Sequence, residues 1–436
     1  MKARPPHTAL AFALAGTLLA SASVISPTTL AADCTRTIGS VLSLTGPIGT
    51  FGVPISRAAQ LAVEQVEEAR AALGVGCALE YDVRDSQSQP SVAVDAASKL
   101  IDIDGIQALV GPISSGITGP LLTSVTVEKG VLVIATASTS PTFTRMSREG
   151  KTKGLFFRTL PADSLQAVAT SKMAYDAGFR KVAIIYFNND WGKNNQAEFK
   201  RSLETLGGAV ANIVPYNQDQ PSYRSEVNKA LEGDPDSLYL LSTPQDGSKQ
   251  LRDWIRFGGA SGLVFAQGMN DPAFVETVGE AALENAWFIS PASPMTPSFQ
   301  TVNADIRACC DLEIDGGPGR TSGYDAGALL ALATVAADIS GMDGTGADLA
   351  GIVRAITGPE GEVFHAGVEG FKQALMKYSV GKDLAYVGVT GPIVFDQHGD
   401  VSASFSALQY RGGEFVEQKA ISLEEVNEIK AMIAAQ

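Results

Sequence analysis

The chain has 436 residues and a formal net charge of −14, with 45% hydrophobic and 18% charged residues. This acidic balance argues against nucleic acid and anionic lipid as partners, because it repels both. The length exceeds what one hydrophobic core normally holds, so we expect at least two domains.

The N-terminus has the pattern of a secretory signal peptide. A short basic start precedes the apolar run ALAFALAGTLLASA, which is too short to span a bilayer. The small residues of TLAA, at 29–32, offer a cleavage site, and the end of the apolar run offers a second one. Asp33 separates TLAA from Cys34, so the cysteine placement of a lipoprotein is absent. We predict a signal peptide at residues 1–32, a soluble exported protein and no direct membrane insertion.

All four cysteines lie in the exported part, where disulfides persist. Cys34 and Cys77 each precede an apolar run. If these runs are neighbouring parallel strands, both cysteines lie at the same edge of the sheet, which predicts a Cys34–Cys77 disulfide. Cys309 and Cys310 are adjacent in the chain, and they either form a vicinal bridge or remain two unbridged thiols.

The first part of the chain alternates short apolar runs with helical patterns. TIGSVLSL reads as a strand, and in the following segment, residues 54–73, apolar residues recur at helical spacing. Three further strands are predicted with helices between them: ALEYDVRD, IQALVG and VLVIAT. This order predicts a parallel sheet with helices on both faces.

A second series of the same kind follows GLFFRTLP, and its first helix ends at Gly178. Its predicted strands are KVAIIYF, AVANIVPY, SLYLLS and LVFAQ, again separated by helices. After NAWFIS the pattern is mainly helical, and the tail alternates like strands around a Gly412-Gly413 turn. We therefore predict an α/β fold with two doubly wound, Rossmann-like lobes and a ligand between them at the strand ends.

Metal, nucleotide and catalytic motifs are absent from the exported part of the sequence. Its two histidines, His365 and His398, are far apart, and no Cys-x-x-Cys or His-x-x-x-His spacing exists. GPISSG lacks both the lysine of a phosphate-binding loop and the spacing of a nucleophile elbow. With so few histidines, a serine nucleophile has no evident base. We expect no metal, no cofactor, no catalytic residue and no enzymatic activity.

The same stretch suits an anion. Ser114 and Ser115 lie where a strand gives way to a helix, where backbone N–H groups and a hydroxyl can bind a carboxylate. The next strand ends in ASTSP, at 137–141, which brings further hydroxyls to the same sheet edge. The alternative is that Ser115 is only a helix cap and that Thr139 is only a turn residue.

Six stretches carry a resemblance to a known family: LSLTGPIGTFGVPISRAAQLAVEQV, LVGPISSGIT, VIATASTSPTFT, YFNNDWGKNNQAEFKRSLETLGG, GYDAGALLAL and GPIVFDQHGD. In these stretches the chain resembles the branched-chain amino-acid (Leu/Ile/Val) binding proteins of ABC importers, which are type I periplasmic binding proteins. The resemblance covers nearly the whole exported chain. It implies two lobes joined by three crossovers. The first lobe would comprise residues 35–159 and 289–389, and the second residues 160–288 and 390–436.

The resemblance also implies a ligand site. Ser115, beside Ser114, corresponds to the family's carboxylate-binding serine, and Ala137 and Thr139 correspond to its backbone and hydroxyl contacts after the fourth strand. The family's aromatic positions fall on Phe51, Trp191 and Tyr324, with the last two facing the cleft from different lobes. For Tyr324, a position in the core remains open.

One position departs from the family. Its amino-acid binders pair the ligand's ammonium with an acidic residue of the second lobe, whereas the nearest match here is the neutral Gln267. Asp271 and Asp246 are the candidate substitutes for this acid, yet neither aligns cleanly. Because a buried ammonium without a carboxylate is costly, an aromatic or aliphatic acid without an amine, or an amide, is an open alternative.

These observations predict a periplasmic, monomeric solute-binding component of an ABC importer. It would capture a small carboxylate-bearing ligand, foremost a branched-chain or other apolar or aromatic amino acid, and deliver it to the membrane permease. A ligand-sensing module that controls a receptor is the alternative of a different class.

Overall fold

The structure is a computed structural model that describes residues 1, 34–292, 294–314 and 319–436. Apart from Met1, the predicted signal peptide at residues 1–32 lies outside the described residues. Within the described ranges, no helix combines the length and the hydrophobicity that a membrane span requires.

Five parallel strands form the sheet of the part that we call the first lobe, in the order β2-β1-β3-β4-β5. The strands are β1 (Thr35–Leu42), β2 (Ala78–Asp85), β3 (Ala108–Val110), β4 (Leu132–Ala135) and β5 (Phe156–Arg158). The helices between them are α1 (Gly49–Leu73), α2 (Pro90–Asp102), α3 (Ser115–Leu121), η1 (Leu122–Thr126) and α4 (Thr142–Arg148). Buried residues of α1 pack on one face of the sheet and those of α2, α3 and α4 on the other, as predicted for a doubly wound lobe.

Helices from later in the chain complete the first lobe, with a small sheet in the order β11-β12-β13. These elements are α10 (Pro297–Cys310), α11 (Arg320–Ile339), α12 (Gly346–Ala355), β11 (Glu362–His365), α13 (Val368–Ser379), β12 (Leu384–Gly388) and β13 (Gly391–Pro392). Helix α11 packs closely against α1 because Gly327 has no side chain. A Cβ there would lie 2.6 Å from the carbonyl oxygen of Ala59. This close approach buries α11 on nearly all sides.

The second lobe has a seven-stranded sheet in the order β15-β14-β10-β9-β8-β6-β7. Its strands are β6 (Lys181–Phe187), β7 (Ala209–Tyr216), β8 (Ser237–Leu241), β9 (Gly262–Phe265), β10 (Ala286–Pro291), β14 (Phe405–Arg411) and β15 (Glu414–Ile421). Its helices are α5 (Asp163–Asp176), α6 (Asp190–Thr205), α7 (Arg224–Leu231), α8 (Pro244–Arg256), α9 (Pro272–Val278), η2 (Glu280–Leu283) and α14 (Leu423–Ala434). Strands β14 and β15 form an antiparallel hairpin around Gly412-Gly413, as the sequence predicts.

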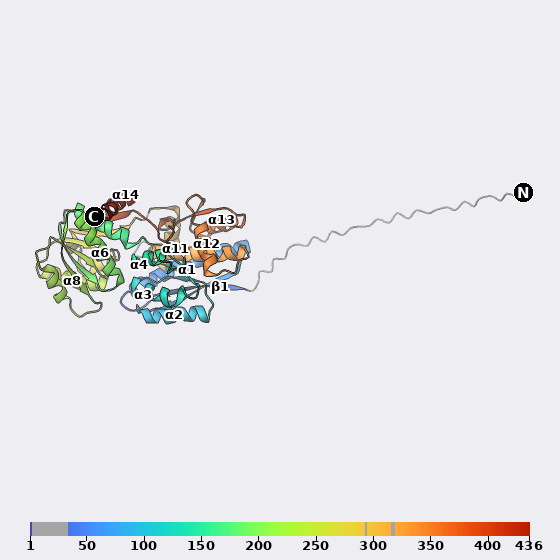
Figure 1. The fold of residues 1–436 in the computed structure, drawn as a ribbon, viewed down its shortest axis with the longest axis horizontal. Helices are drawn as coiled ribbons and strands as arrows, with labels where there is room; N and C mark the ends of the chain where they lie inside the picture. The colour runs from blue at the N-terminus through green and yellow to red at the C-terminus, as the bar shows by residue number, and fades with distance from the viewer. Residues whose placement is uncertain (2–33, 293, 315–318) are drawn as a thin grey trace.

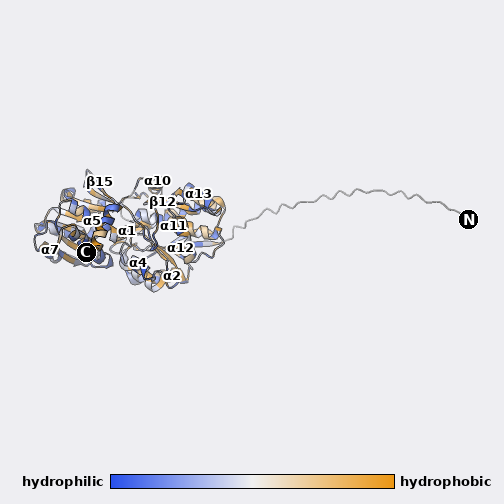
Figure 2. Cartoon of the chain, turned by 45° about the horizontal axis from the view of Figure 1, so that its top comes forward, coloured by the Kyte–Doolittle hydropathy of each residue, from blue (hydrophilic) through white to orange (hydrophobic). Residues whose placement is uncertain are grey.

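The two lobes lie side by side, with α6, α8 and α14 at one end and α2, α12 and α13 at the other (Figure 1). Hydrophobic segments run through the interior of both lobes (Figure 2). The later crossovers differ from the expected lobe boundaries. Strand β10 stays in the second sheet as far as Pro291, and both Ile393 and Val401 belong to the core of the first lobe. The sequence does not indicate these lobe limits, because neither the apolar run that forms β10 nor the short strand β13 shows which lobe it joins.

Two disulfides are present among the described residues. Cys34 joins Cys77, as predicted, because the adjacent residues Thr35 and Ala78 are paired in the parallel strands β1 and β2. Cys309 and Cys310 are also bonded, so the structure takes the vicinal arrangement of the two that the sequence left open.

The Cys34–Cys77 disulfide closes a loop with a sequence separation of 43 residues. Loop-closure entropy predicts that replacing both cysteines by alanine lowers the free energy of unfolding of the first lobe by about 4 kcal/mol. The matched control is the Cys309→Ser and Cys310→Ser double variant, which opens no long loop. Urea unfolding followed by circular dichroism measures both, and equal losses in the two variants would contradict the entropic explanation.

Candidate ligand-binding site

A cavity lies between the two lobes, at the carboxyl ends of their parallel strands. The first lobe and its crossover contribute Ile48, Phe51, Ile113, Ser114, Ser115, Ala137, Thr139 and Leu160. The second lobe contributes Gln166, Phe187, Asn189, Trp191, Ser242, Thr243, Gln267 and Gly268. Most of these residues follow β1, β3 and β4 in one sheet and β6, β8 and β9 in the other. The strand order reverses between β1 and β3 and between β6 and β8, so both topological switch points face this cavity.

The structure brings together seven of the eight residues that the sequence singled out for ligand binding. These are Phe51, Ser114, Ser115, Ala137, Thr139, Trp191 and Gln267. They come from both lobes, and their contact with a ligand remains a prediction.

Tyr324 lies elsewhere. It is fully buried in α11, and its hydroxyl donates a hydrogen bond to the side-chain oxygen of Gln65 on α1. It belongs to the core of the first lobe and does not line the cavity. The expected position facing the cleft is therefore wrong in this structure, because α1 covers the face of α11 that carries the ring.

Ser115 is placed to donate into the cavity. It is the first residue of α3 and is 2% exposed, and its Oγ accepts a hydrogen bond from the Ser140 backbone N–H at 3.2 Å. Among the described residues its hydroxyl has no acceptor, so its proton is available to a ligand oxygen. Ser114 occupies the cap position of α3, but its side chain forms no capping hydrogen bond. The explanation of Ser115 as only a helix cap therefore fails.

Thr139 is bonded differently. Its Oγ1 donates to Oδ2 of Asp163 at 3.0 Å, and its carbonyl oxygen accepts from the Asp163 backbone N–H at 2.8 Å. A hydroxyl has one proton, so this proton is already used inside the protein. Thr139 therefore offers lone pairs to the cavity.

Asp163 is fully buried at the start of α5, immediately after the first crossover. Burial raises the pKa of its carboxyl from 3.8 to about 7, against the opposing effects of hydrogen bonds from Asn195 and Thr139 and of the Arg158 charge. Asp163 was not identified from the sequence. An acidic residue in the first turn of a helix is ordinary, so nothing local in the sequence indicates the contact with Thr139.

Other cavity residues were also missed. Phe187 ends β6 and Ser242 directly follows β8, so the rule that ligands lie at strand ends could have found both. Gln166 is different, because it reaches the cavity from inside α5. Its side-chain oxygen is buried without a partner among the described residues.

None of the described residues that line this cavity is charged. Gln267 stands at the cavity as a neutral amide. Asp271 instead caps α9 by accepting from the Ala273 N–H at 2.7 Å, and Asp246 lies outside the lining with Tyr223 and Lys249 as neighbours. Neither aspartate replaces the second-lobe acid of the family's amino-acid binders.

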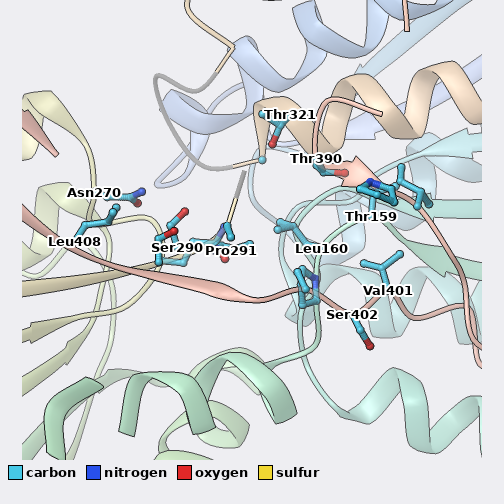
Figure 3. Close-up of a pocket in the computed structure, with 18 of the residues that line it drawn as sticks. Thr159, Leu160, Asn270, Ser290, Pro291, Thr321, Thr390, Val401, Ser402 and Leu408 are labelled. Atoms are coloured by element: carbon cyan, nitrogen blue, oxygen red, sulfur yellow. The ribbon is translucent and has the colours of Figure 1, made fainter. Parts of the chain in front are cut away.

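A second cavity, of about 340 Å³, lies at the crossovers. Leu160 and Val401, from two crossovers, lie on one side of it, and Asn270 of the second lobe lies on the other (Figure 3). Leu160 and Gln267 line both cavities, so the second cavity lies next to the first one, on the side of the crossovers.

Comparison with known proteins decides the class of this molecule. The family described as "Periplasmic binding protein" matches residues 35–357. The chain belongs to this family.

Two relatives are similar over different lengths. The chemotactic signal transduction system substrate-binding protein BasB of Halobacterium salinarum is 28% identical over 82% of this chain and 82% of its own. The Leu/Ile/Val-binding protein BraC3 of Rhizobium johnstonii is 30% identical over 58% of this chain and 63% of its own. The chain thus spans less than two thirds of the second relative.

Solved structures confirm the type I periplasmic binding protein fold. The leucine-binding protein LivK of Thermotoga maritima has a TM-score of 0.73 and 20% identity, and the match covers 89% of this chain and 99% of that protein. A solute-binding protein of an R. palustris ABC transporter, in complex with benzoate, has a TM-score of 0.68 and 18% identity, with 89% and 97% covered. The chain is a solute-binding protein of this fold.

The buried carboxyl of Asp163 makes the stability of this protein pH dependent. Its pKa is raised in the folded state, so its contribution is fully present below pH 3.8 and is lost as the pH rises through about 7. Between about pH 5 and about pH 8, we expect this group to lower the free energy of unfolding by about 3 kcal/mol. Asp163→Asn should remove that part of the pH dependence.

Denaturant unfolding of the wild-type protein and of Asp163→Asn at both pH values measures the effect. Asp95→Asn, at an exposed position on α2, is the control and should keep the wild-type slope. An unchanged slope in Asp163→Asn would show that this carboxyl does not titrate in the range given.

Proposed function

We propose that this chain is the periplasmic solute-binding component of an ABC importer and that it takes a small carboxylate-bearing ligand between its lobes. One observation carries the proposal. The cavity lies where the switch points of both sheets meet, and the hydroxyl proton of Ser115, which has no acceptor among the described residues, is available there to a ligand oxygen. A hydrogen bond to a carboxylate is stronger than one between neutral groups, so this proton favours an anion.

The remainder of the cavity suits an apolar or aromatic ligand body. Phe51, Ile113, Phe187 and Trp191 supply hydrophobic and aromatic surface from both lobes. This composition supports an amino acid with a branched or aromatic side chain, in line with the Leu/Ile/Val-binding name of one relative. An aromatic or aliphatic acid without an amine, or an amide, is the alternative, supported by the uncharged lining and by the benzoate complex of the same fold.

Binding between the lobes also supplies the transport signal. A ligand that contacts Ser115 in one lobe and Trp191 in the other favours the arrangement in which both contacts are made. The membrane permease would recognise this closed form. We propose that the protein works as a monomer in the periplasm, after removal of its signal peptide, and that it releases its ligand without chemical change.

A sensing role is the second candidate. It is favoured by BasB, a chemotactic substrate-binding protein that matches this chain over most of its length. Both roles use the same ligand site, and they differ in whether a permease or a receptor binds the closed form.

Ser115→Ala tests the carboxylate site. The variant loses one charge-assisted hydrogen bond of roughly 1.5–3 kcal/mol, so affinity should fall by about 10- to 100-fold. A thermal-shift screen of amino acids, aromatic acids, short fatty acids and amides first identifies a ligand, and calorimetry then measures its Kd in both proteins.

Ser91→Ala, at an exposed position of α2, is the matched control and should bind as the wild type does. Equal affinity in wild type and Ser115→Ala would remove the carboxylate site. Turnover of the bound ligand during the titration would overturn the binding-only role.

A further inference from the structure

Asp163 lies directly behind the ligand cavity without lining it. It holds Thr139 by two hydrogen bonds, one to its hydroxyl and one to its backbone. Trp191 of the second lobe also lies close enough to lower the pKa of Asp163 slightly, so it favours the charged form. Gln166, another cavity residue, lies one turn further along the same helix. Asp163 therefore connects ligand-facing groups of both lobes.

The hydrogen bonds around Asp163 have defined donors and acceptors. An ionised carboxylate only accepts hydrogen bonds, so every neighbour must donate to it. Asn195 donates from Nδ2 to Oδ1 of Asp163 at 2.8 Å. The oxygen of the same amide, Oδ1 of Asn195, accepts the hydroxyl proton of Tyr239 at 2.7 Å. Oδ2 of Asp163 is left for Thr139, which donates at 3.0 Å.

The cavity is consequently polarised. Ser115 offers a proton, since its oxygen already accepts from Ser140, whereas Thr139 offers only lone pairs. We propose that Asp163 is a positioning residue that sets the hydrogen-bonding direction of Thr139 and thereby the ligand preference of the site. With Asp163 ionised, the site favours a carboxylate that carries a donor beside it, such as a hydroxyl, an amide N–H or an ammonium. This inference rests on the proposed carboxylate site at Ser115.

Protonation of Asp163 reverses the direction of its hydrogen bond with Thr139. Oδ1 keeps its bond from Asn195, so an added proton occupies Oδ2 and is donated to the oxygen of Thr139. The Thr139 proton then turns toward the cavity and favours a ligand acceptor in place of a ligand donor. Two charged or titratable side chains lie beside Asp163, the Arg158 guanidinium and the Tyr239 hydroxyl. Burial raises the pKa of Tyr239, so its hydroxyl stays neutral over the same pH range.

Two pairs of probes isolate the effect of one donor. 2-Hydroxy-4-methylpentanoate is compared with 4-methylpentanoate, and 3-phenyllactate with 3-phenylpropanoate, by calorimetry at about pH 8.5. Within each pair the charge and the carbon skeleton are equal. We expect the wild type to prefer the hydroxy acid by about 10-fold, the value of one buried hydrogen bond. Asp163→Asn should abolish or invert this preference, because its Nδ2 donates to Thr139.

Asp325→Asn is the matched control. Asp325 is also fully buried, and its partners Tyr386, Val389 and Thr390 lie outside the ligand cavity. This variant should leave the preference within each pair unchanged. Thr139→Val should abolish the preference by itself, and adding Asp163→Asn to it should have no further effect on the ratio.

The wild-type protein provides an independent measurement if Asp163→Asn does not fold. Its preference should fall from about 10-fold toward that of the neutral form as the pH drops through about 7. A preference that is the same at all pH values and in all variants, while Ser115→Ala still weakens the binding of all four probes, overturns the role of Asp163 alone. Absence of binding by every probe, with Ser115→Ala equal to wild type, overturns the carboxylate site and this inference with it.

Discussion

The buried guanidinium of Arg158 is the interaction on which the site depends. Arg158 has no exposed surface, and its Nε donates to Oδ1 of Asp400 at 2.7 Å. Its other nitrogens donate to the carbonyl oxygens of Ser138 and Ser140 at 3.1 and 2.9 Å and to Oγ1 of Thr144 at 2.8 Å. A charge removed from water is tolerated only when its partners are all in place. The loop that carries these carbonyls is therefore held in one conformation.

This one side chain joins the ligand loop to the crossovers. Thr139 lies in the sequence between Ser138 and Ser140, whose carbonyl oxygens accept hydrogen bonds from Arg158. The Arg158 guanidinium therefore holds Thr139 in its position at the cavity. Arg158 is also the last residue of β5, just before the first crossover, and Asp400 directly precedes Val401 at the third. The ends of two crossovers and the loop at residues 138–140 are therefore joined to the first lobe by the same side chain.

The sequence predicted most of the fold and the part of the site that depends on local order. Alternating strands and helices specify parallel sheets, and residues just after a strand must lie at its carboxyl edge, which located Ser115 and Ala137. Tyr324 was misplaced because α11 is apolar on all sides, so its sequence does not distinguish the face toward α1 from the face toward the cleft. The roles of Asp163 and Arg158 were not predicted, because their hydrogen-bond partners are distant in the sequence. Hydrophobic periodicity carries no information about such contacts.

The contact between Asp163 and Thr139 changes how the neutral Gln267 is interpreted. A site without a second-lobe acid looks unsuited to a ligand that carries a donor or a positive charge. Yet Asp163 stands one hydrogen bond behind Thr139, and when it is ionised its charge acts strongly across the buried, weakly polarisable interior. The negative charge reaches the ligand through a hydroxyl and does not contact it. Such a charge makes the hydroxyl oxygen of Thr139 a stronger hydrogen-bond acceptor. The ligand does not need to form a direct ion pair with Asp163. It also makes the electrostatics of the cavity depend on the protonation of a residue outside its lining.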